Sequence, residues 1–289
     1  MLTLAVVSGI GLGAMYGLIA LGYYITYAVS STVNFAQGSS MMLGAVVAFV
    51  LAMQLHWPIV PAVIVALIVC ALWGVIVERI AVRPFVRAGS DAWLMSTVAA
   101  GIILENGVLF TFGKEPRSFP SPYSGANLEL GGVAVYPLHV AIPLIGLGVA
   151  AGLHVFSQRT RLGKALLAVV QNPSAARLMG INVEAAITVC YAVSTVFAGI
   201  AGILIAPLYT VAADMGTLFG IKAFAVAILG GISSARGVVL AGFIFGLTEA
   251  LITALLGSSY TNILTFTLVI VALAVKPHGL FGSAGVKKV

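Results

Sequence analysis

The sequence predicts an all-α, polytopic membrane protein, a helical bundle of eight or nine spans in a single domain over residues 1–289. Hydrophobic residues make up 61% of the chain, charged residues only 8%, and the mean hydropathy is +1.15. Soluble domains carry about 25% charged residues, so this chain has too few to cover a surface in water. Each span needs about 20 residues plus a connection, which leaves no room for a soluble catalytic domain.

Apolar segments between polar breaks predict the spans in order along the chain. The first apolar run has no basic residue ahead of it, so we expect a first span rather than a cleaved signal peptide. Two later segments predict broken or re-entrant elements, because one is short and carries Lys222 and the other opens with polar residues after Ser30. The segments cover residues 5–28, 36–55, 58–78, 91–112, 137–157, 185–207, 216–232, 237–256 and 260–275.

Basic residues gather in four short polar breaks. An even number of spans separates consecutive breaks, so all four lie on one side, which the positive-inside rule makes cytoplasmic. The loop over residues 113–136 then lies outside, and the side of the amino terminus stays open. This topology explains the net charge of +6, and without interleaved aromatic residues the breaks do not support nucleic-acid binding. The breaks contain Arg79, Arg83 and Arg87; Arg159, Arg161, Lys164 and Arg177; Arg236; and Lys276, Lys287 and Lys288.

No motif for catalysis is present. The Gly-Lys pairs that begin at residues 113 and 163 lack the upstream glycine of a phosphate-binding loop, and the four histidines are far apart. We therefore expect no enzyme activity, no metal and no cofactor, with any ATP hydrolysis carried out by a partner. Cys70 and Cys190 lie in apolar stretches, where we expect buried thiols and no disulfide.

Glycines recur every four residues on several predicted spans. Such a face lets helix backbones approach closely in lipid, where no hydrophobic effect drives helices together. Close helix packing is therefore expected at Gly9, Gly13 and Gly17, at Gly148 and Gly152, and at Gly242 and Gly246.

Three charged residues lie within predicted spans: Glu105, Lys222 and Glu249. Each charge costs about 2.5 kcal/mol or more in the membrane unless it is paired, so all three should face the interior of the bundle. They either line a permeation path, with Lys222 coupled to Glu249 or Glu105, or form a buried ion pair that sets helix register. Asn106 can satisfy the neighbouring Glu105, which favours a structural role for that carboxylate.

A polar cluster follows the first span and runs directly into a hydrophobic helix. Asn34 or Ser31 is placed to cap the incoming helix. If this helix begins within the membrane, its amino terminus stabilises a carboxylate or polar solute. The alternative is an ordinary helix start at the membrane surface.

The connection over residues 159–184 combines a short amphipathic helix, an Asn-Pro break and a second helix over Ser174–Met179. Its apolar residues would be exposed to the cytosol, which suggests docking into a groove of another protein. An interfacial helix on lipid headgroups is the alternative. The apolar residues are Leu166, Leu167, Val170, Leu178 and Met179.

Six segments along the chain match the pattern of a known family. They are GLIALGYYITYAVSSTVNFAQGSSMMLGA at 17–45, RPF at 83–85, STVAAGIILENGVLFTFGKEPRSFP at 96–120, the 160–183 loop, GIKAFAVAILGGISSARGVVLAGFIFGLTEAL at 220–251 and KPHGLFG at 276–282. Together these segments resemble the LivH type of branched-chain amino acid permease from ATP-binding cassette importers. The resemblance spans nearly the whole chain, and the segments occur in the family's order.

The resemblance implies a permease domain in the bacterial cytoplasmic (inner) membrane. Two permease chains would form the path, two cytoplasmic ATPases would drive it, and an extracytoplasmic binding protein would deliver the solute. The second permease is expected to be a different, related chain, with a homodimer as the alternative. Branched-chain or other hydrophobic amino acids are the expected cargo, whereas relatives carry urea, short amides or other amino acids.

The resemblance also implies roles for individual residues. It assigns docking on the ATPase to the 159–184 loop, through Gly163, Ala168, Asn172, Ala175, Leu178 and Gly180. The early polar element matches at Asn34, Phe35, Gln37 and Gly38, which we place on the translocation path together with Glu105, Lys222 and Glu249. Many relatives have histidine where this chain has Gln37, which leaves the solute open.

A channel or secondary transporter is the alternative class of protein. Such a carrier would use the three intramembrane charges as its relay and would not need a docking loop.

Overall fold

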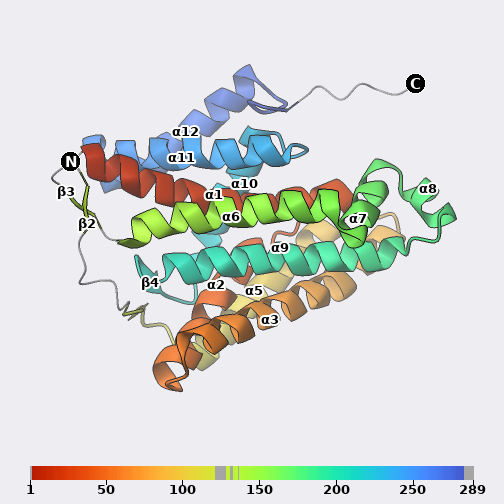
Figure 1. Cartoon of the computed structure of the whole chain (residues 1–289), viewed down its shortest axis with the longest axis horizontal. Helices are drawn as coiled ribbons and strands as arrows, with labels where there is room; N and C mark the ends of the chain where they lie inside the picture. Colours follow the sequence, from red (N-terminus) through yellow and green to blue (C-terminus); the bar gives the residue numbers. More distant parts are fainter. Residues whose placement is uncertain (1, 121–127, 131–132, 136, 283–289) are drawn as a thin grey trace.

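The computed structural model describes residues 2–120, 128–130, 133–135 and 137–282. Long helices run side by side along one axis of the molecule (Figure 1). In chain order they are α1 Leu2–Ser30, α2 Gln37–Phe49 with a π-helical end Val50–Gln54, α3 Ile59–Ile76 with a π-helical end Val77–Val82, α4 Arg83–Arg87, α5 Trp93–Phe112, α6 Pro137–Arg159, α7 Arg161–Gln171, α8 Pro173–Leu178, α9 Val183–Ile205, α10 Met215–Gly230, α11 Ala235–Leu256 and α12 Ser258–Val275.

Among the described residues, eight helices are long and apolar enough to cross a membrane, and the shorter apolar helix α10 makes a ninth candidate. This confirms the predicted all-α bundle of eight or nine spans. Continuous runs of apolar residues, rather than one apolar face, produce these helices, as expected where lipid surrounds the bundle.

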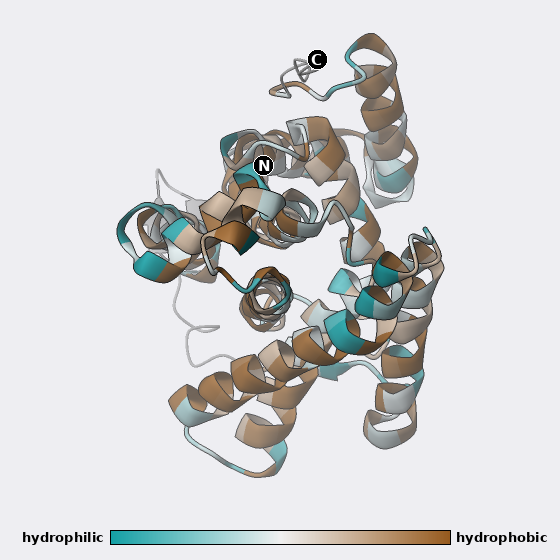
Figure 2. Ribbon diagram, turned by 90° about the vertical axis from the view of Figure 1, so that its right-hand side faces the viewer, coloured by the Kyte–Doolittle hydropathy of each residue, from teal (hydrophilic) through white to brown (hydrophobic). Residues whose placement is uncertain are grey.

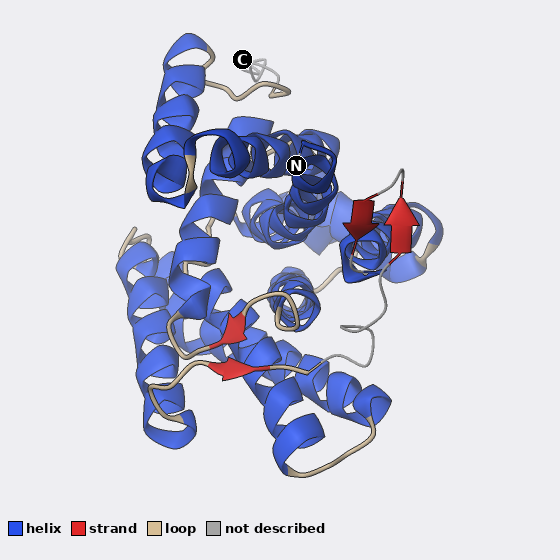
Figure 3. Cartoon of the chain, turned by 90° about the vertical axis from the view of Figure 1, so that its left-hand side faces the viewer, coloured by secondary structure: helices blue, strands red, loops and turns tan. Residues whose placement is uncertain are grey.

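Two small antiparallel ribbons lie at the same end of the bundle as the amino terminus (Figures 1 and 3). One pairs β1 Arg117–Ser118 with β4 Thr210–Val211, and the other pairs β2 Leu128–Leu130 with β3 Val133–Val135. Helices α7 and α8 lie at the opposite end, where hydrophilic segments are displayed (Figure 2). That end carries the described residues of the basic breaks, so the positive-inside rule assigns it to the cytoplasm and the amino terminus to the outside. Lys287 and Lys288 lie outside the described residues.

The second span is broken, as predicted. Helix α1 ends at Ser30, Ser31 has a positive φ of 54°, and the chain returns without regular structure until α2 begins at Gln37. The Gln37 side chain bonds to Ser194, which lies halfway along α9, so α2 begins near the middle of the bundle.

The α10 span is short, also as predicted. Its 16 residues span about 24 Å, less than the roughly 30 Å of hydrocarbon. Gly216 and Gly220 of α10 pack directly on Gly38 of α2, so the amino-terminal ends of both helices meet inside the protein.

Glycine faces join α1 to α11, where Gly9 and Gly13 lie against Gly242 and Gly246. A Cβ atom added to Gly13 would lie 2.7 Å from the Phe243 Cα, closer than two such atoms can pack. Close packing at this interface is therefore confirmed.

Gly148 and Gly152 of α6 were expected to pack in the same way, and that prediction is wrong. A Cβ at either position would meet open space, because this side of α6 faces outward. Cys70 and Cys190 are both buried, as predicted.

Candidate functional site

The polar element before α2 is buried inside the chain. Asn34 and Gln37 have no exposed surface. The Gln37 Nε2 donates to the Ser194 carbonyl (2.8 Å), and its Oε1 accepts from the Ser194 hydroxyl (3.0 Å) and from the Asn34 Nδ2 (3.5 Å). These bonds satisfy the glutamine without a solute and tie the start of α2 to the middle of α9.

Asn34 does not cap α2, contrary to the expectation. Its Oδ1 accepts from the backbone N–H of Ala36 (3.0 Å), one residue before the helix, and so stabilises the turn that leads into it. Phe35 packs edge-on against Phe224 of α10 with ring centroids 5.0 Å apart. Gly38 allows α2 to touch α10, since an added Cβ would collide with the Gly216 carbonyl.

The four residues of the early polar element therefore lie close together in one region of the molecule. Asn34, Phe35, Gln37 and Gly38 lie where α2, α9 and α10 converge, and all but the half-buried Phe35 are buried.

Lys222 of α10 and Glu249 of α11 form a buried ion pair. The Lys222 Nζ lies 2.6 Å from the Glu249 Oε1, with side-chain exposures of 5% and 10%. Of the two partners considered for Lys222, the structure pairs it with Glu249. The attraction offsets part of the cost of burying both charges and fixes α10 against α11.

Glu105 of α5 lies against the first turns of α2 and α10. Its Oε1 accepts from the Ser39 hydroxyl (3.0 Å) and from the Thr217 hydroxyl (2.8 Å). The amino-terminal ends of helices carry partial positive charge, so both ends favour this carboxylate. The Asn106 side chain instead donates to the Ile102 carbonyl, so the expected bond between Asn106 and Glu105 is not formed.

Glu105 differs from the buried pair in its exposure. It is half-buried, and the outer face of α5 beside it is open, with Ile103 71% and Phe110 89% exposed. Sequence reasoning missed Ser39 and Thr217 as partners of Glu105, although each occupies the first turn of a helix that begins inside the protein.

Side-chain caps build the cytoplasmic loop over residues 159–184. The Thr160 hydroxyl accepts from the Gly163 N–H (2.9 Å) at the start of α7. The Asn172 Oδ1 accepts from the Ala175 N–H (3.0 Å) at the start of α8, where Pro173 occupies the first turn. Gly180 ends α8 with a φ of +81°, a conformation that favours glycine.

The apolar residues of this loop differ in exposure, and Leu162 and Val170 of α7 are 70% and 37% exposed. Leu178 and Met179 at the tip are 89% and 81% exposed. Leu166 and Ala168 of α7 instead pack toward the body of the bundle, around the fully buried Val169. The tip thus presents an apolar surface on the cytoplasmic side.

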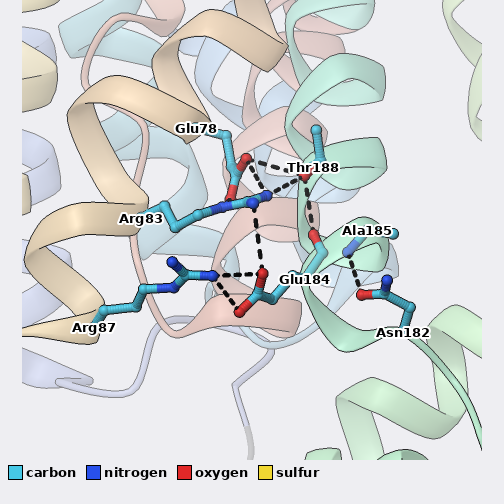
Figure 4. Close-up of polar contacts among 7 residues, drawn as sticks. All are labelled: Glu78, Arg83, Arg87, Asn182, Glu184, Ala185 and Thr188. Carbon is cyan, nitrogen blue, oxygen red and sulfur yellow. Dashed lines mark hydrogen bonds and ion pairs between the residues drawn. The ribbon is translucent and has the colours of Figure 1, made fainter.

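An ion-pair network that sequence reasoning missed joins the end of α3 to the start of α9 (Figure 4). The Arg83 Nε and Nη2 donate to the 2%-exposed Glu78 carboxylate, each at 2.9 Å. The Arg83 Nη2 also donates to the Thr188 hydroxyl (2.7 Å), and Arg87 binds both oxygens of Glu184 at 2.6 and 2.7 Å. Arg83 lies 3.5 Å from Glu184, which completes the network.

Comparison with known proteins identifies the chain. The family model described as "branched-chain amino acid transport system / permease component" matches residues 5–273. The chain belongs to this family. As a family member with eight apolar spans among its described residues, it is a multi-pass membrane protein and a transport permease component.

Curated relatives cover nearly the whole of this family member. It is 32% identical to the high-affinity branched-chain amino acid transport system permease protein LivH of Escherichia coli K12, over 98% of this chain and 96% of the relative. It is 31% identical, over the same shares, to the corresponding protein BraD of Pseudomonas aeruginosa. A more distant relative is the galactose/methyl galactoside import permease protein MglC of Salmonella typhimurium, 30% identical over 66% of this chain and 57% of MglC.

A solved structure shares the fold. The structure titled "PsaBC from Streptococcus pneumoniae in complex with Fab" aligns with a TM-score of 0.52 and 14% identity. The alignment covers 96% of this permease and 92% of that chain.

Proposed function

We propose that this chain is the permease subunit of an ATP-binding cassette importer. It translocates branched-chain or other hydrophobic amino acids across the bacterial inner membrane as a single transmembrane domain. The similarity to LivH over 98% of the chain carries this proposal. ATP hydrolysis belongs to partner subunits, and an extracytoplasmic binding protein delivers the amino acid.

The 159–184 loop docks on the ATPase. Its support is the capped, rigid construction of α7 and α8 and the exposed apolar tip at Leu178 and Met179. Gly163 lets α7 lie close against the end of α6, Gly180 ends α8 with a positive φ, and Ala168 packs α7 on the bundle. Asn172 caps α8, and Ala175 is exposed beside the tip.

The translocation path runs along the face formed by α2, α5 and α10, with Glu105 closest to the solute. Its support is the half-buried Glu105 carboxylate at the amino-terminal ends of α2 and α10. Helix ends that lie inside the protein bind charged or polar solutes in membrane transporters. The second permease subunit closes this face.

The remaining residues assigned to the path hold α2 and α10 in position. Asn34, Phe35, Gln37 and Gly38 hold α2 against α9 and α10, and Lys222 with Glu249 holds α10 against α11. Closure of the ATPases, transmitted through the docking loop, shifts these helices and switches access from outside to inside.

Uptake in proteoliposomes tests the proposal. Vesicles contain this chain, its candidate second permease, the ATPases and the binding protein, and uptake of radiolabelled leucine, alanine and urea is compared with and without ATP. ATP-dependent leucine uptake is the expected result. ATP-dependent uptake of alanine or urea in place of leucine would support an ATP-binding cassette importer with a different substrate. Leucine transport by the purified chain alone would indicate a channel or secondary carrier instead of an importer. Omitting the second permease tests whether this chain acts as a homodimer.

A further inference from the structure

Helix α1 lies between α6 and α11 (Figure 1). A groove lined by residues of these three helices, with α7 and α9 contributing further residues, runs along the surface of α1. In the cytoplasmic half of the bundle the groove widens into a cavity of about 520 Å³. Its walls are apolar, with Leu21 and Ile25 of α1 at the base, Leu153 of α6 on one side and Leu240 of α11 on the other. This groove has no part in the docking tip or in the path proposed above.

The length of the cavity matches one leaflet of the bilayer. It extends along α6 from Ala150, near the middle of that helix, to Gln158 near its cytoplasmic end. Eight residues of helix correspond to about 12 Å, close to the roughly 15 Å of hydrocarbon in a single leaflet.

The groove narrows sharply at mid-depth. Beyond Ala150 the next gap between the same helices has a volume of about 10 Å³ and is lined by Gly17, Gly146 and Phe243. A transmembrane helix, about 10 Å wide, cannot continue through such a gap, whereas an acyl chain ends at the middle of the membrane. The shape therefore favours a lipid chain over a helix of another protein.

Polar and basic groups lie at the cytoplasmic end of the groove. Arg236, His154 and Gln158 line it there, and none of its lining residues is acidic. Among the residues that the structure describes, Arg236 forms no ion pair, and it is exposed in the first turn of α11, at the cytoplasmic end of the groove. Basic pockets between helices on the cytoplasmic side are a recognised way of binding anionic headgroups.

We propose that this groove binds an anionic phospholipid of the cytoplasmic leaflet. One acyl chain lies between α6 and α11, and the phosphate contacts Arg236. Leu166, Leu167 and Val170 of α7 line the same cavity, so the lipid covers apolar surface of α7 that the tip of the loop does not use. The lipid thereby supports the helix from which α8 projects.

Native mass spectrometry of the complete transporter tests this site. The complex is released from nanodiscs that contain equal amounts of phosphatidylglycerol and phosphatidylethanolamine, and the retained lipids are counted. We expect one retained phosphatidylglycerol per copy of this chain. Arg236→Gln should reduce the preference for phosphatidylglycerol about fivefold, the effect of removing one basic residue at a membrane surface. Arg79→Gln, an exposed arginine outside the groove, should leave it unchanged.

A second test blocks the groove with a large side chain and compares lipid retention with that of the wild type. Ala150→Phe places a ring in the cavity and should abolish retention, while Val155→Phe, on an exposed part of α6 outside the lining, should not. Equal lipid retention and equal selectivity in the wild type, Arg236→Gln and Ala150→Phe would overturn the proposal.

Photocrosslinking distinguishes lipid from protein as the occupant. A photoreactive amino acid at Leu153, in intact membranes, should yield adducts with phospholipid. Adducts with another protein would also overturn the lipid assignment, and because neither assay measures transport, their failure would leave the proposed transport function standing.

Discussion

If Glu105 lies on the translocation path, transport should depend on its negative charge and not only on its hydrogen bonds. Glu105→Gln keeps an oxygen that can accept from Ser39 and Thr217 but removes the negative charge. We expect ATP-dependent leucine uptake to fall about tenfold, equivalent to about 1.4 kcal/mol, with unchanged thermal stability. Initial uptake rates in proteoliposomes measure the effect, and Asn106→Ala, one residue along the exposed face, is the control. Undiminished uptake would remove Glu105 from the path.

The buried pair of Lys222 and Glu249 calls for a different test, because removing one partner leaves an uncompensated charge. Lys222→Met should destabilise the protein by about 3–5 kcal/mol, seen as a lower melting temperature. Replacing both, with Lys222→Met and Glu249→Leu, should restore stability. If the pair only fixes α10 against α11, the double variant also transports leucine. A stable double variant that does not transport would instead place the pair on the path.

At the scale of elements, α8 is an exposed tip whose apolar side chains have no partner within the described chain. Leu178→Asp changes a side chain that is 89% exposed, so the fold should be retained. A charge at the centre of an apolar interface should weaken ATPase binding and reduce ATP-dependent uptake about tenfold or more. Co-purification of the ATPase and uptake are measured together, with Leu178→Met as the matched control. Normal co-purification of the Leu178→Asp variant would contradict the docking assignment.

The sequence could predict those elements whose patterns lie within the element itself or close to it in the chain. Hydropathy and basic residues located the spans and the interruption before Gln37, because both signals lie within a few residues of the element. Neighbours across the bundle were harder: Ser39 and Thr217 are 66 and 112 residues from Glu105. The glycines of α6 show the same limit, since spacing identifies a smooth helix face but not whether that face meets another helix, as at Gly148.

Arginines near span ends illustrate a second limit of sequence reasoning. In the sequence, Arg83 and Arg87 served only to mark the cytoplasmic side, and the positive-inside rule was a sufficient explanation for their presence. The structure shows that Arg83 also binds Glu78, five residues earlier in the chain, and that Arg87 binds Glu184, a contact that depends on the end of the α3 segment packing against the start of α9 (Figure 4). A residue can thus satisfy a topological rule and still take part in a specific contact.

At the scale of the whole molecule, this network links the loop over residues 159–184 to the bundle. Glu184 lies in the first turn of α9, directly after the loop, while Arg83 and Arg87 belong to α4 at the end of the long α3 segment. A displacement of α8 that moves the start of α9 therefore pulls on α4 as well. The exposed bond between Arg87 and Glu184 adds little to stability, so it can be removed without unfolding the protein.

Glu184→Gln and Arg87→Gln should accordingly leave folding and ATPase binding intact but weaken the coupling between hydrolysis and transport. A coupling energy of about 1 kcal/mol corresponds to about a fivefold fall in the leucine transported per ATP hydrolysed. The ratio is measured in proteoliposomes, with Arg79→Gln as a control that removes a basic residue outside the network. Because Glu184→Gln already removes the bond to Arg87 together with the contact to Arg83, the double variant should lose no more than Glu184→Gln alone. Additive losses, or a ratio that stays constant while both activities fall together, would show that the network positions the loop without transmitting its movement.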